Sequence, residues 1–528
     1  MFNYLIKNVK ILDGAGNPWK FGDVAIEGDT IAKVGNISES EADNIIDGKG
    51  LYLSPGFIDI HTHSESILFQ DGRAHAHLLQ GVTTNVLGQC GSSPFPMNEK
   101  RKKTIDKSDL DVTWESTGDF IKQFQNKKLS INAVPVVGQG AIRHCVMGYE
   151  PDKPTKDQMD QMKALLKESM ESGCFGVSTG LIYTPSAYAD TDELVELTKV
   201  ISEYDGIYFS HIRGENDFVL DSINEALTIG KKADVAVQIS HLKAMGKHMW
   251  GKSVEILKLI DNARDEGVDV TFDQYPYKAS ATGLGAILPP WAHQGGATEM
   301  RKRLADSKIR DKLKQDIING VDGWISFYKG VGFENILITD TKKTDKSIVG
   351  KTIAEIANDR NDDNPFNTCF DILQNYIGRV SIVYFTISDE DIERIMKHPL
   401  MMVGSDSSAR PIDGPFTSGL PHPRTYGSFV TILSTYVREK GVLTLEEAIR
   451  KMTSSSAFKL GLTDRGLIVP GMKADLVLFN LDEVSTKSTY TDPIQFPTGI
   501  EKVFVNGTLA VDNGKHTNKF AGKVLLKK

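Results

Sequence analysis

The sequence predicts an α/β protein: a (β/α)8 TIM barrel with a small β-sandwich domain formed by both chain termini and an inserted subdomain. Its 528 residues exceed one ordinary domain but suit a large barrel with an appended domain. Between about 55 and 460, short apolar runs alternate with amphipathic helical stretches. The two ends instead alternate apolar and polar residues, as short antiparallel strands do. We therefore expect the two parts of the β domain at 1–54 and 461–528 and the barrel at 55–460.

The two ends of the chain are predicted to share the small β domain. The stretch 4–34 alternates in polarity around a turn-rich segment at 13–18. The segments 474–479 and 502–507 read as strands, and the preceding 466–471 is rich in turn residues. Because neither end has enough strands to bury a core alone, we expect them to combine.

Eight apolar runs are predicted to be the barrel strands, namely 57–60, 83–87, 133–137, 175–178, 207–210, 235–240, 268–272 and 401–404. The stretch 155–170 illustrates the helices between them, because its apolar residues form one stripe for the core: Met159, Met162, Leu165, Leu166 and Met170. An insertion at about 288–369, rich in Lys and Asp, and an extra apolar run at 380–385 disturb the regular count. We expect an added helical subdomain or lid there.

The composition argues against several classes of partner. Apolar residues make up 40%, charged residues 25%, and the net charge is −8, which is typical of a soluble globular protein with no nucleic-acid or membrane partner. The start of the chain lacks a basic region followed by an apolar core, and no run approaches the ~20 apolar residues of a membrane span. These features favour a cytoplasmic protein. The four cysteines are too few for a disulfide scaffold, so each is expected to be a thiol.

Potential metal ligands stand at the carboxyl ends of the predicted strands, where TIM barrels build their active sites. The first strand ends in His61 and His63, whose side chains share one side of an extended chain. Such a pair alone is weak evidence, since two surface histidines also satisfy it. Four further strand ends add the remaining candidates, which are Cys90, His211, His241 and Asp406.

Five nitrogen or sulfur ligands and one carboxylate at one rim predict a site for zinc or a similar cation. Alternatives remain for individual members: Cys90 as an inert buried thiol, and Asp406 as a turn or helix-capping residue. Most of the remaining histidines lack this placement and are expected to be surface or internally satisfied residues, including His75, His77, His144, His248 and His516. Cys145, Cys174 and Cys369 are expected to be ordinary thiols.

Several motifs resemble known families. The segment Gly-Phe-Ile-Asp-Ile-His-Thr-His at 56–63, with His211, His241 and Asp406, is similar to the amidohydrolase superfamily. Cys90 in Gly-Gln-Cys-Gly, together with the segments 178–183, 240–243, 275–277 and 422–427, resembles the N-acyl-D-amino-acid deacylases, or D-aminoacylases. The likeness covers nearly the whole chain. Many superfamily members bridge two metals with a carboxylated lysine, whereas the deacylase pattern has a cysteine in the site.

The resemblance implies how the site is used. Cys90, His211 and His241 would hold one tight Zn2+, and His61, His63 and Asp406 would line a second, weaker or vacant divalent-metal position. Zinc lowers the pKa of bound water to about 7 and polarises a carbonyl. Asp406 is the expected general base and acid, which takes a proton from the attacking water and delivers it to the leaving amine. The expected reaction is hydrolysis of N-acyl-D-amino acids to a carboxylate and a free D-amino acid.

The resemblance also implies four residues that bind the substrate's free carboxylate: Lys243, Arg424, Tyr183 and Tyr275. The stretch 407–420 is longer than the usual family connection, which puts the position of Arg424 in doubt and makes Arg410 a competing partner. Two other functions stay open: a related amidohydrolase for a cyclic amide or a D-residue dipeptide, and a non-catalytic scaffold. The acyl chain, the amino acid side chain and the oligomeric state are not predicted.

Overall fold

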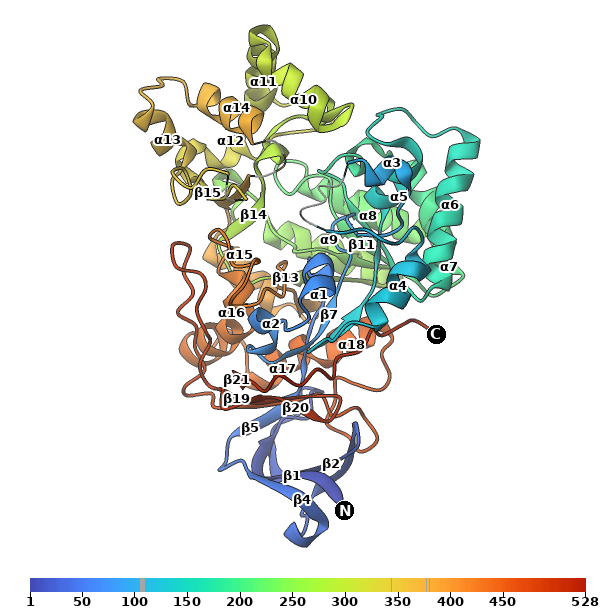
Figure 1. Ribbon diagram of the computed structural model, residues 1–528, viewed down its shortest axis with the longest axis vertical. Helices are drawn as coiled ribbons and strands as arrows, with labels where there is room; N and C mark the ends of the chain where they lie inside the picture. The colour runs from blue at the N-terminus through green and yellow to red at the C-terminus, as the bar shows by residue number, and fades with distance from the viewer. Residues whose placement is uncertain (105–109, 343, 377, 379) are drawn as a thin grey trace.

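The computed structural model describes residues 1–528 except 105–109, 343, 377 and 379. One position of the predicted insertion, 343, is among the residues that the structure does not describe. Figure 1 shows three parts along the long axis: a β sheet that contains the N-terminus, a central α/β body, and a smaller group of helices and strands at the opposite end. The central body carries all the candidate metal ligands.

The central body contains parallel strands that coincide with the eight predicted apolar runs. One sheet has the order β6 (Phe57–Asp59), β7 (Val82–Val86), β8 (Asn132–Val134). The other has the order β9 (Val137–Gly138), β10 (Gly176–Gly180), β11 (Ile207–His211), β12 (Ala236–Ile239), β13 (Val270–Gln274), β17 (Met401–Val403). The single run 133–137 contributes both β8 and β9, because Pro135 has no N–H for a sheet bond and interrupts the strand.

The two parallel sheets meet where β6 and β17 end. The Asp406 amide donates to the His61 carbonyl at 2.9 Å, and the His63 amide donates to the Ser407 carbonyl at 2.8 Å. Apolar side chains of both sheets also form one buried cluster that includes Ile58 and Phe209. These contacts bring the chain after β6 beside the chain after β17, although the two segments are far apart in sequence.

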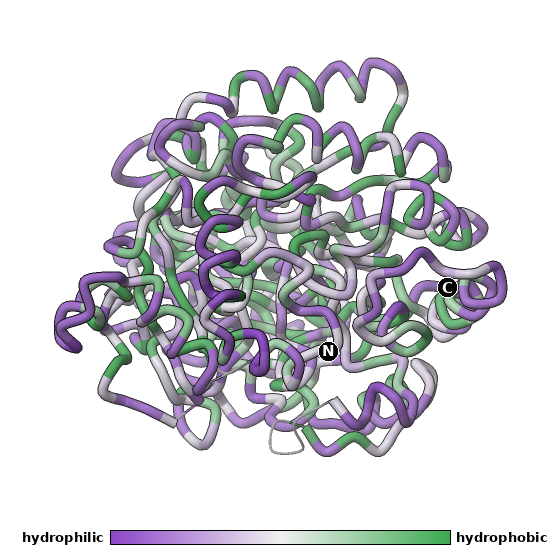
Figure 2. The backbone as a smooth tube through the Cα atoms, turned by 90° about the horizontal axis from the view of Figure 1, so that it is seen from above, coloured by the Kyte–Doolittle hydropathy of each residue, from purple (hydrophilic) through white to green (hydrophobic). Residues whose placement is uncertain are grey.

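Helices follow most of the parallel strands and cover them on the outside. They are α1 (Glu65–Gln70), α2 (His75–Leu78), α3 (Glu99–Lys102), α4 (Thr117–Gln125), α5 (Gln139–Met147), α6 (Lys156–Glu171), α7 (Thr191–Ser202), α8 (Val219–Ala233), α9 (Ser253–Asp265), α15 (Asp389–Lys397), α16 (Arg424–Thr431), α17 (Leu445–Met452) and α18 (Ser454–Leu460). Figure 2 shows hydrophilic stretches on the helices around the rim. Among the described residues, no helix is both long and apolar enough to cross a membrane.

Helix α6 shows how local sequence sets these elements. Thr155 accepts a hydrogen bond from the Gln158 amide while the Gln158 side chain accepts one from the Thr155 amide, so a capping box starts the helix. Met162 and Leu166 on its predicted stripe are buried in the main apolar cluster of the central body. The predicted helix and its core-facing stripe are therefore confirmed.

Both ends of the chain join one mixed sheet of nine strands, as predicted. They are β1 (Phe2–Ile11), β2 (Lys20–Glu27), β3 (Thr30–Gly35), β4 (Ala42–Asp47), β5 (Tyr52–Pro55), β18 (Leu476–Phe479), β19 (Ile500–Val505), β20 (Thr508–Asp512) and β21 (Lys515–His516). The joint is the antiparallel pair of β5 and β18. Since β6 begins two residues after β5, this sheet is attached directly to the central body.

The amino ends of the parallel strands are covered by residues from late in the sequence. The Leu525 amide donates to the Ala133 carbonyl at 2.8 Å, and the Lys527 amide donates to the Gly173 carbonyl at 2.9 Å. Leu525 packs on the interior cluster together with Leu460 of α18. The segment 522–527 thus closes this end of the sheets.

A buried polar group lies at the same end. Arg465 forms an ion pair with Asp475, and both side chains are about 4% exposed. Asp475 also accepts hydrogen bonds from the Asn506 amide at 2.6 Å and the Asn132 side chain at 3.2 Å. The Asn506 side chain donates in turn to Asn132 at 2.8 Å. This network ties the start of β8 to the terminal sheet.

The inserted part is larger and less purely helical than expected. Its strands β14 (Ala279–Gly283), β16 (Ser381–Phe385) and β15 (Ile336–Asp340) form an antiparallel sheet in that order. Its helices are α10 (Gly296–Ala305), α11 (Ser307–Asn319), α12 (Tyr328–Val331), α13 (Ile353–Asp359) and α14 (Pro365–Asn375). The extra apolar run at 380–385 is the central strand β16, so the unit extends beyond 288–369 and has its own apolar cluster.

Candidate metal centre

The candidate ligands surround one cavity of about 430 Å3 at the carboxyl ends of the parallel strands. His63, Cys90, His211, His241 and Asp406 line it directly. His61 is fully buried behind them, with its Nε2 3.4 Å from the Cys90 sulfur. The structure therefore brings together all six residues from five separate strand ends.

The backbone at three of these residues is unusual. Cys90, His241 and Asp406 follow β7, β12 and β17 with φ angles of 53°, 37° and 50°, in the left-handed region. Such conformations cost about 1–3 kcal/mol each in non-glycine residues and cluster at functional sites. Here they turn three side chains from strand ends into the same cavity.

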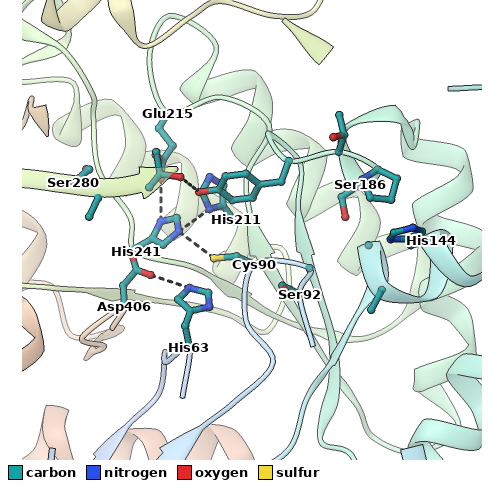
Figure 3. Close-up of a pocket in the computed structure, with 18 of the residues that line it drawn as sticks. His63, Cys90, Ser92, His144, Ser186, His211, Glu215, His241, Ser280 and Asp406 are labelled. Carbon is teal, nitrogen blue, oxygen red and sulfur yellow. Dashed lines mark hydrogen bonds and ion pairs between the residues drawn. The ribbon is translucent and has the colours of Figure 1, made fainter. Parts of the chain in front are cut away.

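The ligand atoms form two overlapping groups. The first contains His61, Cys90, His241 and Asp406, whose donor atoms all lie within 4.8 Å of one another. The second contains His211, Glu215 and His241 at the same spacing. Figure 3 shows His241 between the two groups. Its Nε2 lies 2.8 Å from His211 Nδ1 and 3.5 Å from Cys90 Sγ.

His63 extends the first group toward the mouth of the cavity. Its Nε2 lies 3.1 Å from Asp406 Oδ1, which is also 3.5 Å from His61 Nε2. The His63 side chain is about one-third exposed, whereas His61 is fully buried. One carboxylate oxygen therefore faces two imidazoles, one inside and one at the opening.

The electrostatics of the cluster suit a cation. Burial raises the pKa of the Cys90 thiol well above its usual range, and the nearby Asp406 and Asp273 raise it further. Burial lowers the pKa values of His211 and His241 well below the usual range, so both imidazoles are neutral. Among the described residues, His211 Nε2 is buried without a hydrogen-bond partner. Neutral imidazoles, a thiol and a carboxylate within reach of one ion match the donors that zinc prefers.

Asp406 is ionised despite its burial. Burial opposes its charge, but the Arg424 guanidinium and the neighbouring histidines hold the pKa of this carboxyl well below its usual range. Arg424 Nη1 lies 2.8 Å from Asp406 Oδ2. The oxygen Oδ1 remains directed at the histidines, so one carboxylate contacts both the candidate ligands and a cation.

All four predicted carboxylate-binding residues line the cavity. The Tyr183 and Tyr275 hydroxyls lie 2.8 Å from Thr282 Oγ1 and Ser280 Oγ, respectively. The Arg424 guanidinium carbon lies 4.6 Å from the centre of the Tyr275 ring. Lys243 is buried, forms an ion pair with Glu215, and has its Nζ 2.9 Å from His241 Nδ1.

Arg410, the competing candidate for the substrate carboxylate, instead forms hydrogen bonds within its own loop. Its guanidinium donates to the carbonyls of Phe416 and Ser418 at 2.8 and 2.9 Å. The long stretch 407–420 is thereby closed on itself, and Arg424 still reaches the cavity. The longer connection thus leaves Arg424 beside Asp406.

Sequence reasoning missed two acidic residues of the centre. Asp273, in β13, lies 3.2 Å from His61 Nδ1 and accepts from the His241 amide at 2.8 Å, so it orients two candidate ligands. It directly follows the predicted seventh strand, so the search for metal ligands at the ends of predicted strands would also have identified it. Glu215 lies 3.0 Å from His241 Nδ1 but belongs to the loop after β11, where only its spacing of four residues from His211 marks it.

The chain is similar to known proteins over nearly its whole length. A model of the amidohydrolase family matches residues 373–511. The D-aminoacylase of Alcaligenes xylosoxydans xylosoxydans is 31% identical over 99% of this chain and 97% of its own length. A crystal structure of D-aminoacylase superposes with a TM-score of 0.83 at 31% identity, covering 100% of both chains.

A further solved structure, the N-acyl-D-glutamate deacylase of Bordetella bronchiseptica complexed with zinc and a phosphonate inhibitor, has a TM-score of 0.83 and 29% identity over 99% of both chains. These likenesses extend through the terminal sheet, the central body and the inserted unit alike. The chain belongs to the amidohydrolase family, together with the D-aminoacylases and N-acyl-D-amino-acid deacylases.

Proposed function

We propose that this protein is a zinc-dependent deacylase that hydrolyses the amide bond of N-acyl-D-amino acids to a carboxylate and a free D-amino acid. The observation that carries this proposal is the buried cluster of His, Cys and Asp beside Arg424 in one cavity. Full-length similarity to D-aminoacylase supports the substrate class. The D configuration rests on that similarity.

We also propose that the parallel strands form one closed (β/α)8 barrel, with the β domain at 1–54 and 461–528 packed as a sandwich. The contacts of His61 and His63 with Asp406 and Ser407, which link the ends of β6 and β17, support the closure. Closure explains why ligands from distant positions in the sequence share one cavity.

In this proposal, Cys90, His211 and His241 hold the tight zinc ion, and His61, His63 and Asp406 line a second, weaker position. The short distances from His241 to both Cys90 and His211 support the first set. When bound, such an ion supplies a Lewis acid that polarises the amide carbonyl and makes water acidic enough to react at neutral pH. Asp273 and Glu215 orient the imidazoles from behind.

Asp406 is the proposed proton carrier. Its carboxylate is ionised and lines the cavity, so it is able to take a proton from the attacking water. The same carboxyl group then delivers this proton to the nitrogen of the departing amine. Arg424 fixes the carboxylate through Oδ2 and leaves Oδ1 for the transfer.

The substrate's free carboxylate is proposed to bind at Arg424, Lys243, Tyr183 and Tyr275. A guanidinium carries five donors, so Arg424 is able to contact Asp406 and a second carboxylate at once. Lys243 and Tyr275 lie on the same side of the cavity, with the ammonium 5.7 Å from the ring centre. A cation cluster of this kind explains why an acylated amino acid, rather than a simple amide, is the substrate.

The decisive experiment is a hydrolysis screen over paired N-acetyl-D- and N-acetyl-L-amino acids, with cyclic amides and D-residue dipeptides as further substrates, combined with metal analysis. We expect D-selective turnover and stoichiometric zinc in the purified protein. The Cys90→Ala variant should lose most of its zinc together with its activity. Preference for L substrates would overturn the proposed substrate class, and protein without zinc would favour a scaffold.

A further inference from the structure

The cavity continues beyond the candidate ligands to a far end that the proposed reaction does not use. Figure 3 shows Ser92, Ser186 and His144 on the side of Cys90 away from Glu215 and Asp406. Arg101 and Tyr149 line this end as well. Because these residues and the metal ligands surround one continuous cavity, a substrate held at the metal centre is able to extend toward them.

Arg101 is exceptional among the buried arginines of the described chain. Four arginine residues are less than about one-tenth exposed: Arg101, Arg143, Arg424 and Arg465. The other three each contact a carboxylate, namely Glu193, Asp406 and Asp475, respectively. Arg101 instead donates to the backbone carbonyls of Ser93 and Pro96. It forms no ion pair with any residue that the structure describes.

The neighbours of Arg101 do not neutralise it. Burial raises the pKa values of the Cys145 thiol and the Tyr149 hydroxyl, so both are uncharged at neutral pH. Burial, together with the nearby Arg101 and Lys100, lowers the pKa of His144 to about 4, so this imidazole is neutral too. A buried charge without a counter-ion, as Arg101 is among the described residues, is costly, and two carbonyl bonds and a contact with the Cys145 thiol leave part of the five-donor guanidinium unused.

We infer that the far end of the cavity receives a second carboxylate of the substrate, bound by Arg101. This inference rests on the proposed deacylase function and narrows it to substrates that carry one carboxylate on the amino acid and another on the side chain or the acyl group. The first carboxylate binds at Arg424 and Lys243, and the second lies across the metal centre from it. Ser92 and the neutral His144 supply polar contacts around the second carboxylate.

Two matched substrate pairs test the inference and separate the two sources of the carboxylate. N-acetyl-D-glutamate is compared with N-acetyl-D-glutamine, and N-succinyl-D-leucine with the corresponding succinamide. Each pair differs by one charge at nearly constant shape. We expect the wild-type protein to favour the acid in one pair by at least about 10-fold in kcat/KM, since a charge-assisted hydrogen bond contributes that much. The pair that responds identifies the side chain or the acyl group.

The variant Arg101→Met should reduce that preference by about 10- to 150-fold while the neutral substrate is hydrolysed as before. Arg410→Met is the matched control, because Arg410 also binds only carbonyls among the contacts described but serves its own loop. Arg101→Lys should retain part of the preference. The preference is a ratio within one protein sample, so partial misfolding does not alter it.

Two results would overturn the inference while leaving the deacylase proposal intact. One is a wild-type protein that hydrolyses the neutral member of both pairs as well as the acid, which needs no variant. The other is an active Arg101→Met protein with an unchanged acid preference. If no N-acyl-D-amino acid is hydrolysed at all, the proposed function itself fails and this inference fails with it.

Discussion

The two ends of the parallel strands both bury polar side chains, but in opposite ways. At the amino end, Arg465 and Asp475 form an ion pair that asparagine side chains extend, so opposite charges and complementary groups meet. At the carboxyl end, His211 and His241 bring two ring nitrogens within 2.8 Å, and a thiol lies beside them. The first arrangement is complete in itself, whereas the second becomes favourable when a cation binds between the ring nitrogens and the thiol. Burial of polar groups therefore marks a functional site only where the groups do not complement one another.

The largest expected effect comes from removing the charge of the carboxylate at the carboxyl end. Asp406→Asn should lower kcat by about 10²- to 10⁴-fold, because it removes the proposed proton carrier. The free energy of unfolding should fall as well, because Arg424 loses its buried counter-charge, but the tight zinc should remain. Steady-state kinetics, metal analysis and denaturant unfolding of the same sample measure all three. Near-normal turnover would exclude Asp406 as the proton carrier.

The matched substitution at the amino end, Asp475→Asn, should lower stability without an effect on catalysis. It leaves Arg465 buried without a counter-charge, so the free energy of unfolding should fall by about 3–5 kcal/mol. The zinc content and kcat of the folded fraction should match the wild type. Urea unfolding followed by circular dichroism gives the stability. A loss of kcat in fully folded protein would show that the two ends are coupled.

A smaller effect is expected from the cations beside the metal centre. Arg424→Gln and Lys243→Met should each lower kcat/KM for N-acetyl-D-amino acids by about 10- to 150-fold relative to the corresponding methyl esters, which have no carboxylate to bind. Kinetics on acid and ester pairs measure this ratio. Equal losses for acids and esters would mean that these residues act only through Asp406 or Glu215.

The smallest effect concerns a histidine pair outside the metal centre. Burial, helped by the facing His516 and by Arg73, lowers the pKa of His75 to about 4, and Asp413 and Asp71 oppose this shift only in part. In the unfolded chain the pKa of this histidine is about 6.5, so between pH 6.5 and 4 the unfolded chain binds a proton that the folded protein does not. The contribution to the free energy of unfolding is therefore present above pH 6.5 and is lost as the pH falls toward 4.

His75→Gln should remove about 1–2 kcal/mol of this pH dependence, allowing for partial solvent screening. Thermal unfolding between pH 4.5 and 7.5 measures the slope. The His516→Gln variant is the natural companion, because it removes the imidazole that faces His75. A slope identical to the wild type in both variants would place the titrating groups elsewhere.

The sequence was sufficient to predict the positions of the central strands and to predict that the six candidate ligands lie close together. The parallel strands are short apolar runs buried on both faces, and each candidate ligand stands at the end of one of them or a few residues beyond it. The sheet of the inserted unit was not predicted, because β14 is Ala-Ser-Ala-Thr-Gly, which has little apolar character, and pairs with a strand about a hundred residues later. Arg101 was missed because its significance lies in the lack of a counter-ion among the described residues around it, and a sequence motif does not reveal which groups surround a side chain in the fold.

The cover over the amino ends of the strands has a consequence for synthesis. Ile58, near the start of the central body, and Leu525 pack in the same apolar cluster. Nearly the whole chain must therefore be synthesised before the two side chains meet. At ~5–20 residues per second, translation of 528 residues takes roughly 30 to 100 seconds. During that time the partly built core exposes its apolar end to water. We therefore expect nascent chains that stall before residue 522 to recruit chaperones.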